Sequence, residues 1–142
     1  MEHEVGSIQV TAELKDEEAE KITNLTAVTE KYGFLRTRPK EHFYAVFLKS
    51  DNEVIGDKLI GLGTTGSAPA DMKDIARTAV LTNASAVILV HNHPSNNDDA
   101  SPEDKQLTQE IQRGLEIFDI EVLDHVIITQ STHYSMKKAG DI

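Results

Sequence analysis

The sequence contains no cysteine among its 142 residues. The chain can therefore form neither a disulfide nor a thiolate zinc site, and any bound metal must have nitrogen and oxygen ligands. This absence excludes most structural zinc modules. It also excludes the zinc deaminases, because their site requires a Pro-Cys-x-x-Cys segment.

Basic residues are also few. The 14 lysines and arginines are outnumbered by 24 aspartates and glutamates, which gives a formal net charge of −10. Such a chain repels a phosphate backbone, because nonspecific affinity for nucleic acid comes largely from cationic side chains that displace counterions. We therefore expect no direct DNA binding. The basic cluster "RTRPK", residues 36–40, is interpreted as a solvated linker.

Long apolar runs are absent as well, since no segment approaches the roughly 20 apolar residues of a membrane span. The opening residues "MEHEVGSIQV" do not form a basic region followed by an apolar stretch. We therefore expect a cytoplasmic protein without a membrane partner. The share of hydrophobic residues, 39%, is ordinary for a soluble protein, and the length fits one globular unit.

Hydrophobic periodicity predicts strands that alternate with helices. Helices are expected over 16–33, 68–83 and 101–119, and strands over 7–14, 85–90, 121–129 and 133–138, with a hairpin over 41–63. This alternation predicts an α/β fold with a mixed β-sheet flanked by helices. We expect residues 1–40 to form an N-terminal extension, a strand and a helix, that packs on a domain formed by residues 41–142.

The segment "GLGTTG", residues 61–66, matches the three-glycine pattern of dinucleotide-binding proteins. That pattern also requires an acidic residue at the end of the next strand to hold the ribose hydroxyls, and here that strand ends in "ILVHNH". We interpret these glycines as a crossover loop between a strand and a helix.

The most informative segment is "HNHPSNNDDASPED", residues 91–104, which directly follows the apolar run "SAVILV". Residues two apart on a strand point to the same side, so His91 and His93 can present both imidazoles to one point. Asn92 is expected to face away. Pro94 then ends the strand, because it lacks a backbone donor.

The helix that follows can bring a carboxylate to the same point. Ser101 is a good N-cap residue, Pro102 suits the first helical position, and Asp104 occupies the third. Taken singly, Asp104 is explained as a capping-box carboxylate and each histidine as a surface residue. Taken together, three nitrogen and oxygen ligands without a fourth describe a catalytic zinc site, whose open position holds water. Such a site also requires a general base.

These residues resemble the JAMM motif of the JAB/MPN metallopeptidases, in which His-x-His-Pro is followed at a fixed spacing by Ser-x-x-Asp. With "SAVILVHNHPS" and "LDHVII", the segment from about Glu41 to the C-terminus is most similar to the RadC-type branch. The resemblance implies a layered architecture like that of the cytidine deaminases. It also implies that His91, His93 and Asp104 bind Zn²⁺, that Glu41 is the general base, and that Ser101 stabilises the oxyanion.

The reaction that this resemblance implies is zinc-dependent hydrolysis of an amide bond. The expected partner is a peptide or an isopeptide-linked protein, including ubiquitin-like modifiers. The chain differs from the usual RadC-type pattern at Asn96 and Asn97, in the loop between the two histidines and the helix.

Some of these assignments have rivals. Glu53 and Asp57, on the second strand of the hairpin, are alternatives to Glu41 as the base. The role of Ser101 competes with capping of the helix. His125 is interpreted as a strand residue that is hydrogen-bonded in the core, not as a ligand.

The function has a rival as well. A metal site can be kept because it holds a loop and a helix together, so the alternative is a non-catalytic, metal-stabilised interaction module or an accessory protein in DNA repair. An edge strand near residues 7–14 or at the C-terminus makes an oligomer possible.

Overall fold

A computed structural model describes residues 20–63 and 70–142. Its centre is a mixed five-stranded sheet in the order β2-β1-β3-β4-β5. The strands are β1 (Glu41–Leu48), β2 (Val54–Gly63), β3 (Ala86–Asn92), β4 (Glu121–Ile128) and β5 (His133–Ser135). β3 and β4 are parallel, and the other neighbours are antiparallel. The predicted mixed sheet and the hairpin over 41–63 are confirmed.

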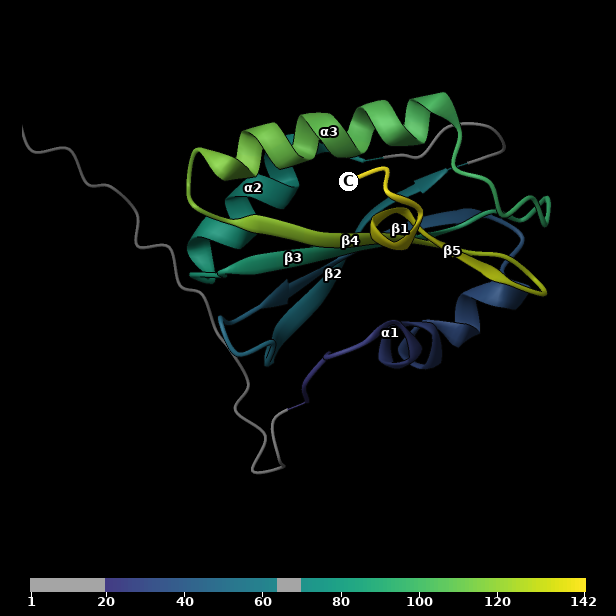
Figure 1. Ribbon diagram of the computed structural model, residues 1–142, viewed down its shortest axis with the longest axis horizontal. Coiled ribbons are helices and arrows are strands. Elements are labelled where there is room, and N and C mark those ends of the chain that lie inside the picture. Colours follow the sequence, from purple (N-terminus) through teal and green to yellow (C-terminus); the bar gives the residue numbers. More distant parts are fainter. Residues whose placement is uncertain (1–19, 64–69) are drawn as a thin grey trace, which may run out of the picture.

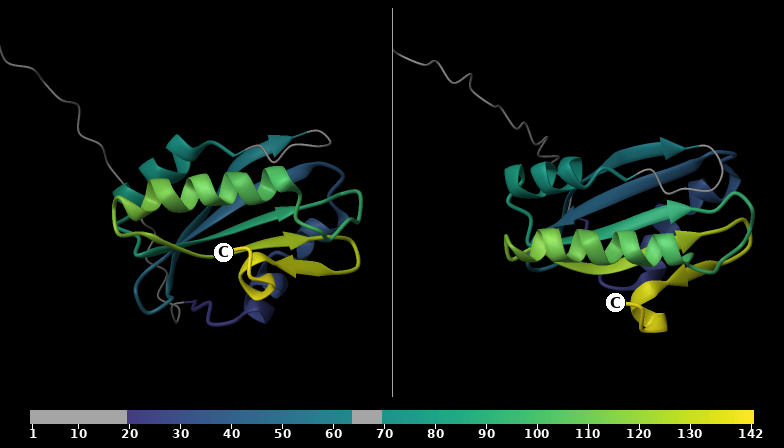
Figure 2. Two further views of the ribbon diagram at one scale, coloured as in Figure 1. Left: turned by 45° about the horizontal axis from the view of Figure 1, so that its top comes forward. Right: turned by 90° about the horizontal axis from the view of Figure 1, so that it is seen from above.

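Helices cover both faces of this sheet (Figure 1). Helices α2 (Met72–Leu81) and α3 (Pro102–Glu116) lie over one face, where Figure 2 shows them side by side. Helix α1 (Leu25–Lys31) and the 3₁₀ helix η1 (Gly33–Thr37) lie against the other face. The prediction of an α/β sheet flanked by helices is therefore confirmed.

The central strands are apolar because each face of the sheet has its own core. Along β1, Phe43, Ala45 and Phe47 pack toward α2 and α3, in one cluster with buried residues of both helices. Val46 and Leu48 pack toward α1 and η1 in a second cluster. Every residue of β3 is buried, which explains its continuous apolar run. Its polar exceptions are the histidine and the asparagine at its C-terminal end.

Two predicted element bounds are wrong. The helix expected over 16–33 begins only at Leu25, because Asn24 is its N-cap and accepts a hydrogen bond from the Ala27 amide at 2.9 Å. Before it, Lys21 forms an isolated antiparallel bridge with Glu53. The predicted strand over 7–14 and residues 64–66 of the predicted crossover loop lie outside the described residues. Residues 61–63, which were assigned to that loop, are the end of β2 and pair with β1.

The strand expected over 133–138 is also too long. Pairing with β4 stops at Ser135, where helix α4 (Met136–Ala139) begins. The Ser135 hydroxyl caps this helix by accepting a hydrogen bond from the Lys138 amide at 3.1 Å. Gly140 ends it in the left-handed region, with φ of +82°.

In the part of the chain that the structure describes, no helix is long and apolar enough to cross a membrane.

Candidate metal centre

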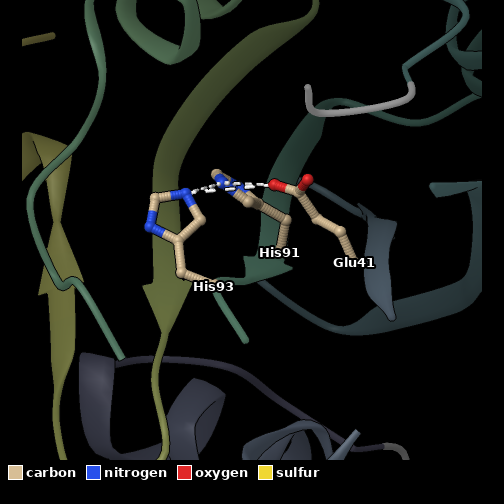
Figure 3. A group of neighbouring side chains, drawn as sticks. All are labelled: Glu41, His91 and His93. Carbon is tan, nitrogen blue, oxygen red and sulfur yellow. Dashed lines mark hydrogen bonds and ion pairs between the residues drawn. The ribbon is translucent and has the colours of Figure 1, made fainter. Parts of the chain in front are cut away.

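The candidate site lies where the start of β1 meets the end of β3. Glu41 is the first residue of β1, His91 lies in β3, and His93 directly follows that strand. The antiparallel ladder pairs Phe43 with His91, so the two strand ends lie beside each other. Figure 3 shows the side chains of Glu41, His91 and His93 pointing toward one point.

The ligand atoms are close together. The Nε2 atoms of His91 and His93 are 2.9 Å apart, and Glu41 Oε1 lies 3.7 Å from the first and 3.9 Å from the second. Asp104, in the first turn of α3, also lies beside the two histidines. Its Oδ1 lies 3.5 Å from His91 Nε2, and its Oδ2 lies 3.2 Å from His93 Nε2. Each of the two carboxylates therefore lies within 4 Å of both imidazoles.

This arrangement fits a bound cation. Glu41 and Asp104 are only 5% and 3% exposed, and burial of two neighbouring carboxylates costs free energy unless positive charge compensates them. Glu41, His91 and His93 each offer one ligand atom within 4.8 Å of the others. These residues could hold a metal ion. Their nitrogen and oxygen donors suit zinc and other first-row transition metals.

Each histidine also has its second ring nitrogen engaged. His93 Nδ1 lies 2.7 Å from the backbone oxygen of Asn97, which can only accept, so Nδ1 donates and the neutral ring keeps its lone pair on Nε2. His91 Nδ1 lies 2.6 Å from His125 Nε2 in the core. Partners of this kind orient metal-binding imidazoles. Both rings therefore turn Nε2 toward the site.

The start of α3 forms a capping box between Ser101 and Asp104, so Asp104 has a structural role in the helix as well. Ser101 Oγ accepts a hydrogen bond from the Asp104 amide, and Asp104 Oδ2 accepts one from the Ser101 amide, both at 3.0 Å. The carboxylate therefore caps the helix and faces both histidines at once. The cap uses a lone pair of the Ser101 hydroxyl and leaves its proton free to be donated elsewhere.

The two carboxylates have pKa shifts in opposite directions. Burial raises the pKa of Glu41, although the nearby His91 and His93 partly offset this. Burial also acts to raise the pKa of Asp104, but its interactions with His91 and His93 outweigh that effect and hold the pKa well below its usual range. Paired carboxylates with separated pKa values are typical of sites in which one group exchanges a proton and the other stays ionised.

Comparison with known proteins agrees with this geometry. The family model of the RadC-like JAB domain matches residues 18–141. The chain belongs to the RadC family. It is 35% identical to a UPF0758 protein of Chlorobium chlorochromatii over 108 residues, which cover 76% of this chain and 49% of that relative. It is 38% identical to a UPF0758 protein of Desulforudis audaxviator over 106 residues, which cover 75% and 46%.

A third relative is similar to this chain over a comparable share of its length. A UPF0758 protein of Clostridioides difficile is 38% identical over 104 residues, 73% of this chain and 44% of the relative. This RadC-family chain thus spans about half the length of the curated relatives it matches. The resemblance to the RadC-type branch of the JAB/MPN family, which was inferred from the histidine motif, is confirmed.

The two rivals of Glu41 lie away from the site of this RadC-like domain. Asp57 accepts a hydrogen bond from the Tyr32 hydroxyl at 2.7 Å, on the face that α1 covers. Glu53 precedes β2 at the turn of the hairpin, where it forms an ion pair with Lys49. Glu41 instead pairs with Gly63 at the opposite end of that hairpin. Of these acidic side chains, only Glu41 is within 4 Å of the two histidines.

The role of Asn92 was not predicted from the sequence. This residue is 1% exposed and faces away from the site, as expected. Its Nδ2 donates to the backbone oxygen of Lys40 at 2.9 Å, and its Oδ1 accepts from the His42 amide at 2.6 Å. Asn92 therefore holds the backbone on both sides of Glu41. A buried asparagine between two histidines was the available signal, but its partners are about 50 residues away in the sequence.

Replacement of Asn92 by alanine is expected to lower the free energy of unfolding by about 1–3 kcal/mol, because it leaves the partly buried backbone groups of Lys40 and His42 without these partners. Urea unfolding of the metal-free protein measures this effect. Gln130→Ala, which removes an exposed amide, is the control and should change the free energy by less than about 0.5 kcal/mol. Equal stability of Asn92→Ala and the parent would show that these hydrogen bonds do not hold the start of β1.

Proposed function

We propose that this chain is a zinc-dependent hydrolase of the JAMM type that cleaves an amide bond in a peptide or an isopeptide-linked protein. The observation that carries the proposal is the meeting of two imidazole Nε2 atoms with two buried carboxylates, each within 4 Å of both histidines.

The proposed roles follow the positions of the side chains. His91, His93 and Asp104 would hold Zn²⁺, which supplies a polarised carbonyl and an acidified water when it is bound. Glu41, whose pKa is raised by burial, is suited to take the proton of that water and to pass it to the leaving amine. Its Oε1 is the carboxylate atom that faces the histidine pair.

Ser101 is proposed to stabilise the oxyanion. Its capping bond uses the hydroxyl as an acceptor, so capping and donation of the hydroxyl proton to a substrate oxygen are compatible. Capping of α3 therefore does not prevent Ser101 from acting on a substrate oxygen, as the sequence had suggested it could.

The net charge of the chain restricts the class of substrate that it can bind. A net charge of −10 disfavours nucleic acid, so we propose protein substrates, including proteins linked to ubiquitin-like modifiers, in the cytoplasm. Loop residues near the site, such as those at 95–100, would determine which substrate fits.

Two measurements test the proposal. Metal analysis of the purified protein is expected to find about one zinc per chain, and a panel of isopeptide-linked protein pairs and short peptides is expected to include substrates that the zinc-loaded protein cleaves. The chelator-treated protein is the control. Bound zinc without cleavage of any substrate would favour the metal-stabilised interaction module or the DNA-repair accessory role, and the absence of zinc would contradict both functions.

A further inference from the structure

A chain of buried hydrogen bonds connects His91 to the start of α3. His91 Nδ1 lies 2.6 Å from His125 Nε2, and His125 Nδ1 lies 2.6 Å from Thr108 Oγ1. Thr108 Oγ1 in turn donates to the backbone oxygen of Asp104 at 2.8 Å. His91, His125 and Thr108 are all fully buried. The chain thus passes from β3 through β4 to α3 without contact with solvent.

The direction of these bonds follows from the number of protons. A hydroxyl has one proton, and Thr108 gives it to a carbonyl oxygen one helical turn earlier, which can only accept. Thr108 Oγ1 must therefore accept from His125 Nδ1. A neutral imidazole has one N–H, so Nε2 of His125 accepts, and the N–H that it accepts belongs to His91 Nδ1. The remaining lone pair of His91 is then on Nε2, which faces the site.

We propose that Thr108 and His125 are positioning residues that set the tautomer of His91, so that its Nε2 presents a lone pair to the metal. The inference rests on the proposed metal ligation by His91, but it does not depend on hydrolysis. With the opposite direction of bonding, the proton would sit on His91 Nε2 and would block ligation.

Packing against Phe43 holds the imidazole rings of His91 and His125 in place. Phe43 stacks on His91 with ring centroids 5.7 Å apart and an interplanar angle of 12°. The same ring meets His125 edge-on at 5.4 Å. Phe43 thus contacts both imidazoles and restrains their ring planes without involving the Thr108 hydroxyl. Removal of that hydroxyl should therefore change the tautomers while the rings stay in position.

The test compares Thr108→Val, which keeps the shape and removes the hydroxyl, with Thr108→Ser, which keeps the hydroxyl. Nitrogen-15 NMR of labelled histidines in the metal-free protein reads the tautomers, and competition with a chelator reads zinc affinity. In the parent and in Thr108→Ser, His91 should carry its proton on Nδ1. In Thr108→Val, the proton should move at least partly to Nε2, and zinc affinity should fall about 10- to 100-fold.

Thr78→Val is the matched control, because it makes the same change in helix α2, away from the site. It should leave the histidine spectra and zinc affinity unchanged. A neutral His91 with its single proton on Nε2 and none on Nδ1 in the metal-free parent would overturn the inference without any variant, so the test does not depend on the folding of Thr108→Val. Unchanged zinc affinity in folded Thr108→Val would also overturn it. Zinc binding without hydrolysis in the parent would count against the proposed function alone.

Discussion

Replacement of Glu41 by glutamine is expected to leave zinc bound and to lower the rate of hydrolysis by about 10²- to 10⁴-fold, the usual contribution of a general base. Glutamine has nearly the same shape, but its amide cannot take up a proton. Burial, which raises the pKa of Glu41, brings that pKa closer to neutrality, where proton transfer from water is easier. The metal content and the single-turnover rate of both proteins would be measured.

Asp104→Asn is the matched control for this experiment. It makes the same chemical change in the second buried carboxylate, and the asparagine oxygen can still accept the capping bond from the Ser101 amide. We expect this variant to lose zinc affinity, because a neutral amide is a weaker ligand than a carboxylate. If Glu41→Gln loses zinc and Asp104→Asn retains it, Glu41 is the metal ligand and Asp104 is the candidate general base. That outcome has a structural basis, because Glu41 groups with His91 and His93 as a possible metal ligand.

The parts of the site that the sequence could predict depend on short-range rules. The two-residue period of a strand placed His91 and His93 on one side, and the capping preference of serine placed Asp104 in the first turn of α3. Both features need only the local backbone conformation. The raised pKa of Glu41 was not accessible in this way, because it depends on burial beside residues 50 positions later in the chain.

Long-range partners explain what the sequence could not predict. His125 was expected to be a hydrogen-bonded core histidine, and it is, but its partners His91 and Thr108 lie 34 and 17 residues away. Hydrophobic periodicity reports which face of a strand is buried and does not report which polar groups meet there. The late start of α1 has a related cause, because the acidic segment before it favoured a helix locally while Lys21 pairs with Glu53 instead.

Replacement of His93 by alanine is expected to empty the metal site. The variant loses one of three proposed protein ligands, and the remaining side chains have too few donors to hold zinc against water. Zinc content after dialysis against a metal-free buffer would be measured by elemental analysis. His133→Ala is the control, because His133 is an exposed histidine of β5 and should leave the zinc content unchanged.

Loss of the metal should also appear in thermal stability, because a ligand that binds only the native state stabilises it. At a free zinc concentration of about 100 times Kd, this stabilisation is about 2.7 kcal/mol, or roughly 5 to 11 °C in Tm for a chain of this size. A chelator should therefore lower the Tm of the parent and of His133→Ala, and it should not change the Tm of His93→Ala. If His93→Ala binds zinc as tightly as the parent and responds equally to the chelator, the assignment of His93 as a ligand is wrong.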